Sequence, residues 1–340
     1  MYEYGWLVLF VLWAIMRRLD QTNNNWVALL IIAASIAFTI SCSEGPTVVF
    51  QVVDDEGNPV EAAEVSAGYT TGGGWTGTQP KTHPQKGLSD QNGSFVYQGL
   101  DGTTKPIFAS VSKKGYYETT FAEQTISQAN DKDRPIKLIL RKIDNPVPMY
   151  ARDSMLDTAI EIPEKDTDIG FDLTLYDWVE PYGSGKTSDF IFNLEKQFND
   201  WNDYESTLKI TFTNVDDGIL SVTEDTIYGS KFKLPRYAPE SGYKSELVLS
   251  LKNRDGRLSQ ISKSNSYVFR VRSTDGEGSG HRKAMYGKIR GPIEYDVINS
   301  DTALILMNYY LNPDNSRNLE FDVKQNLFAG LPTRSVIRHP

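Results

Sequence analysis

The sequence predicts an all-β protein with two β-sandwich domains that follow an N-terminal export or anchor helix. Apolar and polar residues alternate in residues 136–140, 208–213 and 267–272, which is the pattern of half-buried strands. Turn sequences such as residues 90–93 separate these runs with Asn, Asp and Gly, which tolerate the positive φ angles of tight hairpins. The apolar run of residues 26–40 supplies the N-terminal helix.

The N-terminal segment, residues 1–41, has the features of an export signal. Arg17 and Arg18 precede the apolar run of residues 26–40, as in the charged and apolar regions of a signal peptide. Residues 5–15 form a second apolar stretch that is too short to cross a bilayer. We therefore expect the true start to be Met16, with Met1 as the alternative.

Cys42 is the only cysteine and follows this segment directly. The sequence Thr39-Ile40-Ser41-Cys42 resembles a bacterial lipobox, which implies lipidation of Cys42 and a membrane anchor. A lone thiol in an exported chain has no disulfide partner within it. Ordinary cleavage after Ser41, an uncleaved anchor and a plain buried thiol are the alternatives. We expect an exported, lipid-anchored protein at the bacterial outer membrane, on the cell surface or in the periplasm.

The charge balance argues against a nucleic acid partner. The chain holds 35 Lys and Arg against 44 Asp and Glu, a net charge of -9, and phosphate binding needs clustered cations. Three scattered histidines, His83, His281 and His339, do not suit a catalytic zinc site. We therefore expect no zinc chemistry and no nucleic acid ligand.

One segment departs from the strand pattern. Phe190, Leu194 and Phe198 recur every four residues, which fits one face of a helix. The spacing predicts a helix over residues 190–201.

Residues 46–142 contain an ordered set of strand and turn motifs. These are Val53-Asp54 with Gly57 and Pro59-Val60, then Leu88-Ser89-Asp90 with Gly93 and Phe95, then Lys114-Gly115-Tyr116-Tyr117 before the strand at residues 136–140. The set resembles the carboxypeptidase regulatory-like domain, a transthyretin-like β-sandwich. The resemblance implies an accessory domain without an active site.

A second β-rich domain is predicted over residues 145–328, followed by a tail at residues 329–340. It begins at Asn145-Pro146-Val147-Pro148, where we expect a domain junction that proteases can cut. Its motifs resemble the region that follows the same regulatory-like domain in uncharacterised exported bacterial proteins; they include Gly170-Phe171-Asp172-Leu173, Asp177-Trp178-Val179, Tyr286-Gly287-Lys288-Ile289 and Tyr309-Tyr310-Leu311-Asn312. The resemblance implies an envelope location and no known activity.

A glycine-rich sequence, Gly183-Ser184-Gly185-Lys186-Thr187, is similar to the end of a phosphate-binding loop. A Walker A loop also needs a glycine where this chain has Glu180, and a strand, loop and helix around it. We therefore expect no nucleotide and an exposed flexible loop.

Carboxylates supply the enzymatic alternative. Five of them lie in the segments of the second domain that carry the resemblance, and glycoside hydrolysis needs a pair across a cleft; they are Asp172, Asp177, Glu180, Glu320 and Asp322. The competing interpretation is structural, with Arg317 pairing with Glu320 or Asp322. Calcium on Asp-rich turns such as residues 90–93 is an alternative to plain hairpin turns; we expect no other cofactor.

Aromatic residues are the candidate ligand contacts. Trp75, Trp178 and Tyr182 stand in or near predicted loops, where an exposed ring can stack on a sugar or anchor a protein. The alternative is that Trp178, like Trp201, folds back onto its own domain. The sequence thus favours a lipid-anchored envelope protein that binds or scaffolds a glycan or protein without catalysis, with a polysaccharide-acting enzyme as the alternative.

Overall fold

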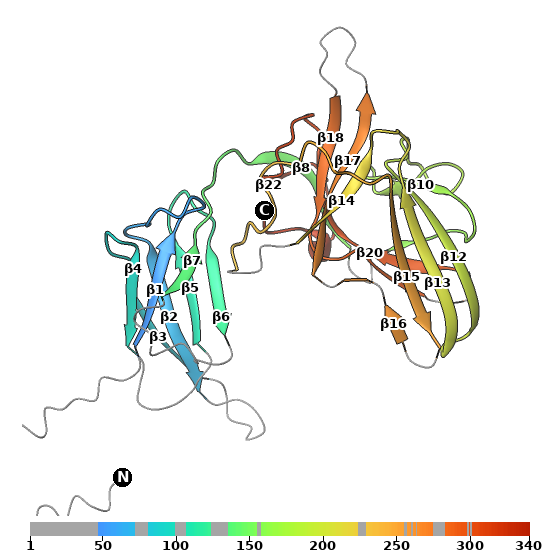
Figure 1. Cartoon of the computed structure of the whole chain (residues 1–340). Coiled ribbons are helices and arrows are strands. Elements are labelled where there is room, and N and C mark those ends of the chain that lie inside the picture. The colour runs from blue at the N-terminus through green and yellow to red at the C-terminus, as the bar shows by residue number, and fades with distance from the viewer. Residues whose placement is uncertain are drawn as a thin grey trace, which may run out of the picture.

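The computed structural model describes residues 47–71, 81–98, 107–123, 135–154, 158–223, 229–254, 257–259, 261–262, 264–274, 283–297, 299 and 301–340. Strands dominate this part of the chain, which contains no α-helix (Figure 1). The prediction of an all-β protein is confirmed for these residues. No helix capable of crossing a bilayer is present among them. Cys42, Trp75 and the apolar run before Cys42 lie outside the described residues.

The N-terminal unit, residues 47–142, contains two sheets. In the first, the central strand β1 pairs antiparallel with β4 and parallel with β7. The second has the strand order β3-β2-β5-β6. The strands are β1 (Thr47–Val53), β2 (Glu64–Thr71), β3 (Lys81–Leu88), β4 (Ser94–Gln98), β5 (Ile107–Ser112), β6 (Thr119–Glu123) and β7 (Ile136–Ile139).

Both sheets contribute to one hydrophobic core. Phe50 and Leu138 from the first sheet and Val111 from the second are fully buried in it. Burial alternates along β1 and β5, because successive side chains of a strand point to opposite faces. The turn before β4 requires glycine, since Gly93 has φ +72° and an added Cβ would lie 2.2 Å from the Val52 carbonyl oxygen.

The C-terminal unit, residues 145–340, contains three sheets with the orders β11-β10-β12-β13-β15-β16, β14-β17-β18-β21-β8-β22 and β19-β20-β9. Its elements are β8 (Val147–Asp153), β9 (Ile160–Glu161), β10 (Ile169–Asp172), β11 (Asp177–Trp178), β12 (Phe190–Asp200), β13 (Asp203–Thr211), β14 (Gly218–Thr223), β15 (Glu246–Asn253), β16 (Arg257–Ser259), β17 (Asn265–Thr274), β18 (Lys283–Ile289), β19 (Glu294–Val297), β20 (Ala303–Leu306), β21 (Asn308–Asn312), β22 (Phe321–Asn326) and the 3-10 turn η2 (Thr333–Ser335).

The three sheets share a second, larger core that is rich in aromatic rings. Phe190 packs edge-to-face against Phe192 and Phe269, with ring centroids 6.0 and 5.1 Å apart. All three rings are fully buried. Because Phe192 faces the core together with Phe190 and Leu194, this segment has a period of two rather than 3.6.

The helix predicted over residues 190–201 is therefore wrong. Residues four apart share a face in a strand as well as in a helix, so Phe190, Leu194 and Phe198 could not separate the two structures. The segment forms β12, which pairs with β13 along its length.

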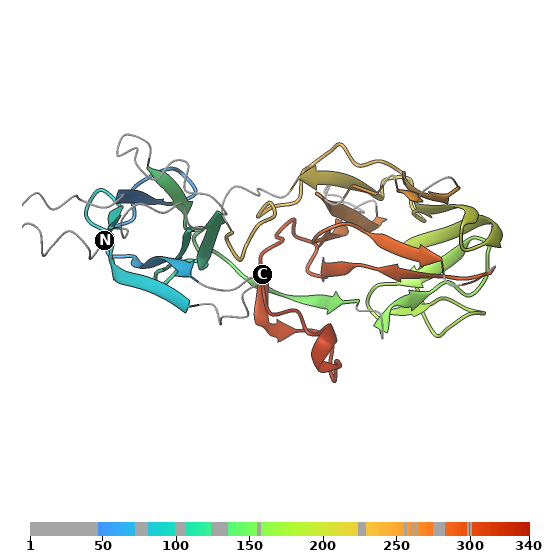
Figure 2. The same ribbon diagram turned by 90° about the horizontal axis from the view of Figure 1, so that it is seen from below.

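The C-terminal tail is docked on the unit. Ile337 is buried in a small cluster with Met149 and Ala151 of β8, and the Tyr310 hydroxyl donates to the His339 carbonyl at 3.3 Å. Figure 2 shows the C-terminus beside the strand through which the chain enters this unit. The last residues thus close a core that begins at β8.

Candidate functional site

Trp178 is buried in the aromatic core. Its ring packs edge-to-face on Phe171 and Phe192, and Nε1 donates to the Glu161 carbonyl at 2.9 Å. Only 8% of the residue is exposed. The structure therefore places this ring in the scaffold, as the competing interpretation of the sequence expects.

Tyr182 and Trp201 lie closer to solvent. The Tyr182 hydroxyl donates to the Glu164 carboxylate, and its ring packs against the core. Trp201 sits in the turn between β12 and β13 and is 57% exposed, with Phe198 packed edge-to-face against it at 5.5 Å. Trp201 does not fold back onto its domain, contrary to the sequence-based expectation. Of the predicted aromatic contacts, Trp178 is thus buried in the core and Tyr182 packs at its edge, while Trp75 lies outside the described residues.

Asp172 is a structural carboxylate. Its oxygens accept bonds from the amides of Lys186 and Thr187 at 3.0 and 3.1 Å and from the Thr174 hydroxyl at 2.6 Å. Arg272 bridges it to the buried Asp189. Burial alone would raise the pKa of Asp172, but these hydrogen bonds outweigh it and lower the pKa.

The glycine-rich loop at residues 183–187 is held by the same kind of contact. Asp177 accepts bonds from the backbone amide and hydroxyl of Ser184 at 2.9 and 2.6 Å. A Cβ on Gly183 would lie 2.4 Å from the Trp178 carbonyl. The expected flexible loop is therefore wrong: its amides are directed at carboxylates of this chain, and its glycines permit close packing.

Glu320 is fully buried and has four donors. The Tyr117 hydroxyl donates at 2.8 Å, the amides of Asp144 and Asn145 at 2.9 and 3.0 Å, and Arg236 forms an ion pair with it. Burial would raise its pKa, but the bonds from these amides, Arg236 and Tyr117 lower it.

The predicted partner Arg317 instead pairs with Glu240 at 3.0 Å. Asp322 accepts bonds from Lys324 and Gln325 within its own turn, and Glu180 is exposed. Asp172 and Asp177 are cross-strand partners, but both carboxylates are held by hydrogen bonds within the protein, and none of the five predicted carboxylates lines the cavity described below.

Asp90, the candidate calcium ligand, also caps its own turn. Its Oδ1 accepts bonds from the amides of Asn92 and Ser94 at 2.9 and 2.7 Å. His83 stacks on Tyr69 with ring centroids 4.8 Å apart. Within the residues that the structure describes, no three His, Cys, Asp or Glu side chains are grouped to hold a metal ion.

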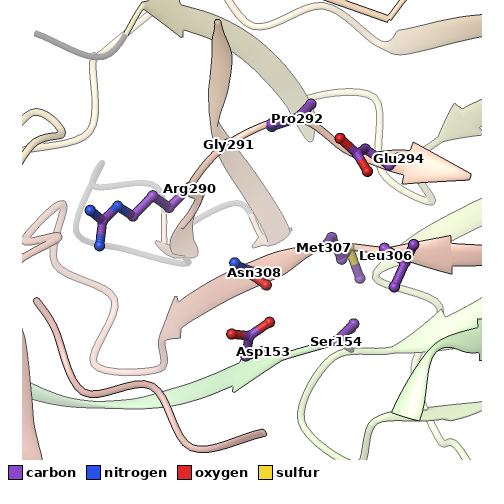
Figure 3. A pocket seen from close by; sticks show the side chains of 9 residues that line it. All are labelled: Asp153, Ser154, Arg290, Gly291, Pro292, Glu294, Leu306, Met307 and Asn308. Carbon is purple, nitrogen blue, oxygen red and sulfur yellow. The ribbon is translucent and has the colours of Figure 1, made fainter. Parts of the chain in front are cut away.

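A cavity of about 360 Å³ lies elsewhere in the C-terminal unit, at the end of β8 (Figure 3). Three segments far apart in sequence line it: residues 153–154, residues 290–294 and residues 306–308. Strand pairing brings them together, because Asn308 is the cross-strand partner of Asp153 and Leu306 is the partner of Glu294. Cross-strand partners point to the same face with Cβ atoms about 5 Å apart.

The loop over residues 290–294 is fixed by its backbone. The Arg290 amide donates to the Asn308 carbonyl at 2.9 Å, and the Gly291 amide donates to the Ser266 hydroxyl at 2.9 Å. Gly291 has φ +81°, a conformation that glycine adopts at little cost. This turn directs the chain into β19, where Glu294 reaches the cavity rim.

Three side chains of this cavity have no partner among the described residues. Asp153, Glu294 and Asn308 make no side-chain hydrogen bond or ion pair with any described residue. Burial raises the pKa of Asp153. The neighbouring cation, Arg152, lies 3.6 Å from the centre of the Tyr176 ring, on the other face of β8 as strand alternation requires.

The remaining lining sets the shape of the cavity. Met307 is buried, and the Ser154 hydroxyl is bonded to the Tyr176 hydroxyl at 2.8 Å. The cavity therefore has two carboxylates, one amide and the Arg290 side chain in its lining beside an apolar floor, and the carboxylates and the amide can accept bonds from hydroxyl groups of a polar ligand. The sequence analysis missed this set, because no local motif marks a site assembled by long-range strand pairing.

Comparisons with known proteins assign the chain to no family. No family model and no curated protein matches the chain. Among solved structures, a match is the crystal structure of 3-chlorocatechol 1,2-dioxygenase from Rhodococcus opacus 1CP, with 16% identity and a TM-score of 0.21. That match covers 30% of this chain and 62% of the dioxygenase chain. A likeness this weak carries no argument about fold or activity.

Proposed function

We propose that the protein is a lipid-anchored, non-catalytic binding component of the bacterial envelope, with a glycan as the favoured ligand and an envelope protein as the other. In this proposal Cys42 carries the anchor after export. Residues 46–142 form a carboxypeptidase regulatory-like β-sandwich, and a second sandwich carries the ligand site. The signal-like segment before Cys42 supports the location.

One observation carries the binding proposal: Asp153, Glu294 and Asn308 line a cavity without any partner in the described protein. Half-buried polar groups normally find hydrogen bonds. A sugar offers several hydroxyl donors, which two carboxylates and an amide oxygen can accept. The ligand would thus complete bonds that the fold leaves open.

The carboxylates with the most contacts support a non-catalytic role. Asp172, Asp177 and Glu320 are each held by three or more bonds within the protein. A general acid or base must instead exchange a proton with substrate. These groups stabilise loops and strands.

The binding test uses the purified mature protein on a glycan array, followed by calorimetry with the best neutral oligosaccharide. We expect Asp153→Asn to weaken binding about tenfold or more, since a charge-assisted hydrogen bond contributes about 1.5–3 kcal/mol, and Asn308→Ala to weaken it about twofold to tenfold, since a neutral bond contributes about 0.5–1.5 kcal/mol. Asp322→Asn, whose carboxylate bonds only within its own turn, is the matched control. Unchanged affinity in both cavity variants would refute the cavity as the site.

The alternative is a polysaccharide-acting enzyme with its carboxylate pair in residues 145–328. One observation favours it: burial raises the pKa of Asp153, whereas Glu294 is exposed on the opposite rim. Glycoside hydrolysis uses two carboxyl groups that flank the bond to be cleaved. Release of reducing ends from polysaccharides by the parent, lost in both Asp153→Asn and Glu294→Gln, would replace the binding proposal with this one.

The anchor is tested separately. Mass spectrometry of the mature protein should find an acylated N-terminal Cys42, and Cys42→Ala should move the protein from the membrane to the soluble fraction. An unmodified N-terminus at Ser43 or later would contradict the anchor and leave the cavity test unaffected.

A further inference from the structure

A segment of the C-terminal unit lies on the N-terminal unit. We call residues 229–238, which follow β14, the strap. The Thr120 amide donates to the Gly229 carbonyl at 3.1 Å, and the Lys231 amide donates to the Glu118 carbonyl at 3.0 Å. The strap therefore extends the sheet β3-β2-β5-β6 beyond its edge strand β6. An edge strand presents unpaired backbone groups, and here the other half of the chain pairs with them.

Side chains fasten the strap to the same unit. Arg141 donates through Nη1 to the carbonyls of Phe232 and Leu234 at 2.9 and 2.7 Å. The rings of Tyr117 and Phe232 are 5.3 Å apart, and Phe232 is fully buried. These contacts join residues beside β6 and β7 of the N-terminal unit to a segment that begins after β14.

We call the contacts between the N-terminal unit, the strap and residues 144–147 the joint. The Glu320 carboxylate binds groups from all three. It binds Tyr117 of the N-terminal unit, the amides of Asp144 and Asn145 between the units, and Arg236 of the strap. Its side chain has no exposed surface. Removing any of these donors would leave a buried charge with fewer bonds, which is costly.

Lys288 holds the backbone next to Glu320. Its Nζ donates to the Leu319 carbonyl at 2.7 Å and lies 4.8 Å from the centre of the Phe232 ring. The side chain is buried between β18 and the strap. The position of Glu320 is thus set from the side of the C-terminal unit, and it fixes Tyr117 on the other side.

We propose that Glu320 is a positioning residue that locks the two units into one rigid body, with the strap as the closing element. The prolines near residue 145 do not provide a free hinge, because the amides before them bind Glu320 and the Val147 amide donates to the Glu320 carbonyl at 2.8 Å. The lock holds whether or not the cavity binds a ligand. The lock therefore keeps the cavity at a fixed position relative to the N-terminal unit.

Distance measurements between the units test the lock. Spin labels are placed by Val96→Cys on the N-terminal unit and Val248→Cys on the C-terminal unit, both exposed positions, in the mature chain with Cys42→Ser. We expect one narrow distance distribution in the parent. Glu320→Gln and Tyr117→Phe should broaden it, and Asp322→Asn should leave it unchanged.

Hydrogen exchange supplies a second readout on the same variants. The amides of Thr120 and Lys231, which bond across the joint, should exchange roughly tenfold to hundredfold faster in Glu320→Gln and Tyr117→Phe, as expected for a lost charge-assisted bond. Tyr117→Phe keeps the ring and decides the question if Glu320→Gln fails to fold. A broad distribution in the parent, or a Tyr117→Phe variant like the parent in both readouts, would overturn the proposal.

Discussion

The carboxylates at the joint and those at the cavity differ in how many hydrogen bonds they receive from the protein. Glu320 is fully buried and receives four donors, whereas Asp153 is half-buried and receives none from the described residues. Hydrogen bonds lower the pKa of Glu320 against its burial, while burial raises that of Asp153. The number of partners, more than burial, separates a carboxylate of the scaffold from one left for a ligand.

The largest effect is expected at the joint. Glu320→Ala should lower the free energy of unfolding by about 3–5 kcal/mol, because it leaves the half-buried Arg236 with only its longer ion pair to Asp55 and removes the acceptor of Tyr117 and of two backbone amides. Urea unfolding followed by circular dichroism measures this loss. A change below about 1 kcal/mol would mean that the network contributes no more than a surface ion pair.

Lowering the pH should change the contribution to stability of Glu320 and Asp172 and that of Asp153 in opposite directions. The pKa values of Glu320 and Asp172 are lowered in the folded protein, so their stabilisation is present above the unfolded pKa and is lost as the pH falls through the folded value, below about pH 4. Asp153, with its raised pKa, acts in the opposite direction. The urea midpoint between pH 7 and pH 3 should fall less steeply in Glu320→Gln than in the parent. If the urea midpoint fell equally steeply with pH in both proteins, protonation of Glu320 would not contribute to the loss of stability in acid.

Asp153→Asn should affect binding much more than stability. No bond within the described protein is lost, so the free energy of unfolding should change by less than about 1 kcal/mol, while affinity for the ligand falls. Parallel urea titration and calorimetry provide the comparison. Destabilisation of several kcal/mol would assign Asp153 to the scaffold.

Trp201→Ala should have the smallest effect on stability, within about 0.5 kcal/mol, because the residue is 57% exposed. If Trp201 contacts the ligand, glycan affinity falls at the same time, and Trp201→Phe should retain part of it. Thermal melting and the glycan array measure the two properties. A large drop in melting temperature would contradict the exposed position of the ring.

Local sequence patterns predict many strands and turns of this fold, but they do not predict the residues of the cavity. The alternation at residues 136–140, 208–213 and 267–272 predicts β7, β13 and β17, and Gly57 and Gly93 have the positive φ angles that their turns imply. The spacing of Phe190, Leu194 and Phe198 wrongly predicts a helix, because residues four apart share a face in a strand as well as in a helix. The cavity depends on the pairing of Asp153 with Asn308, and no local sequence signal specifies a pairing over such a distance along the chain.

The position of β8 also has a consequence for how the chain is made. β8 is the first strand of the C-terminal unit, yet it pairs with β21 and β22, and Ile337 closes its core. These partners come much later in the sequence than β8, so its sheet cannot close until they have been synthesised, and folds dominated by such distant pairings form slowly.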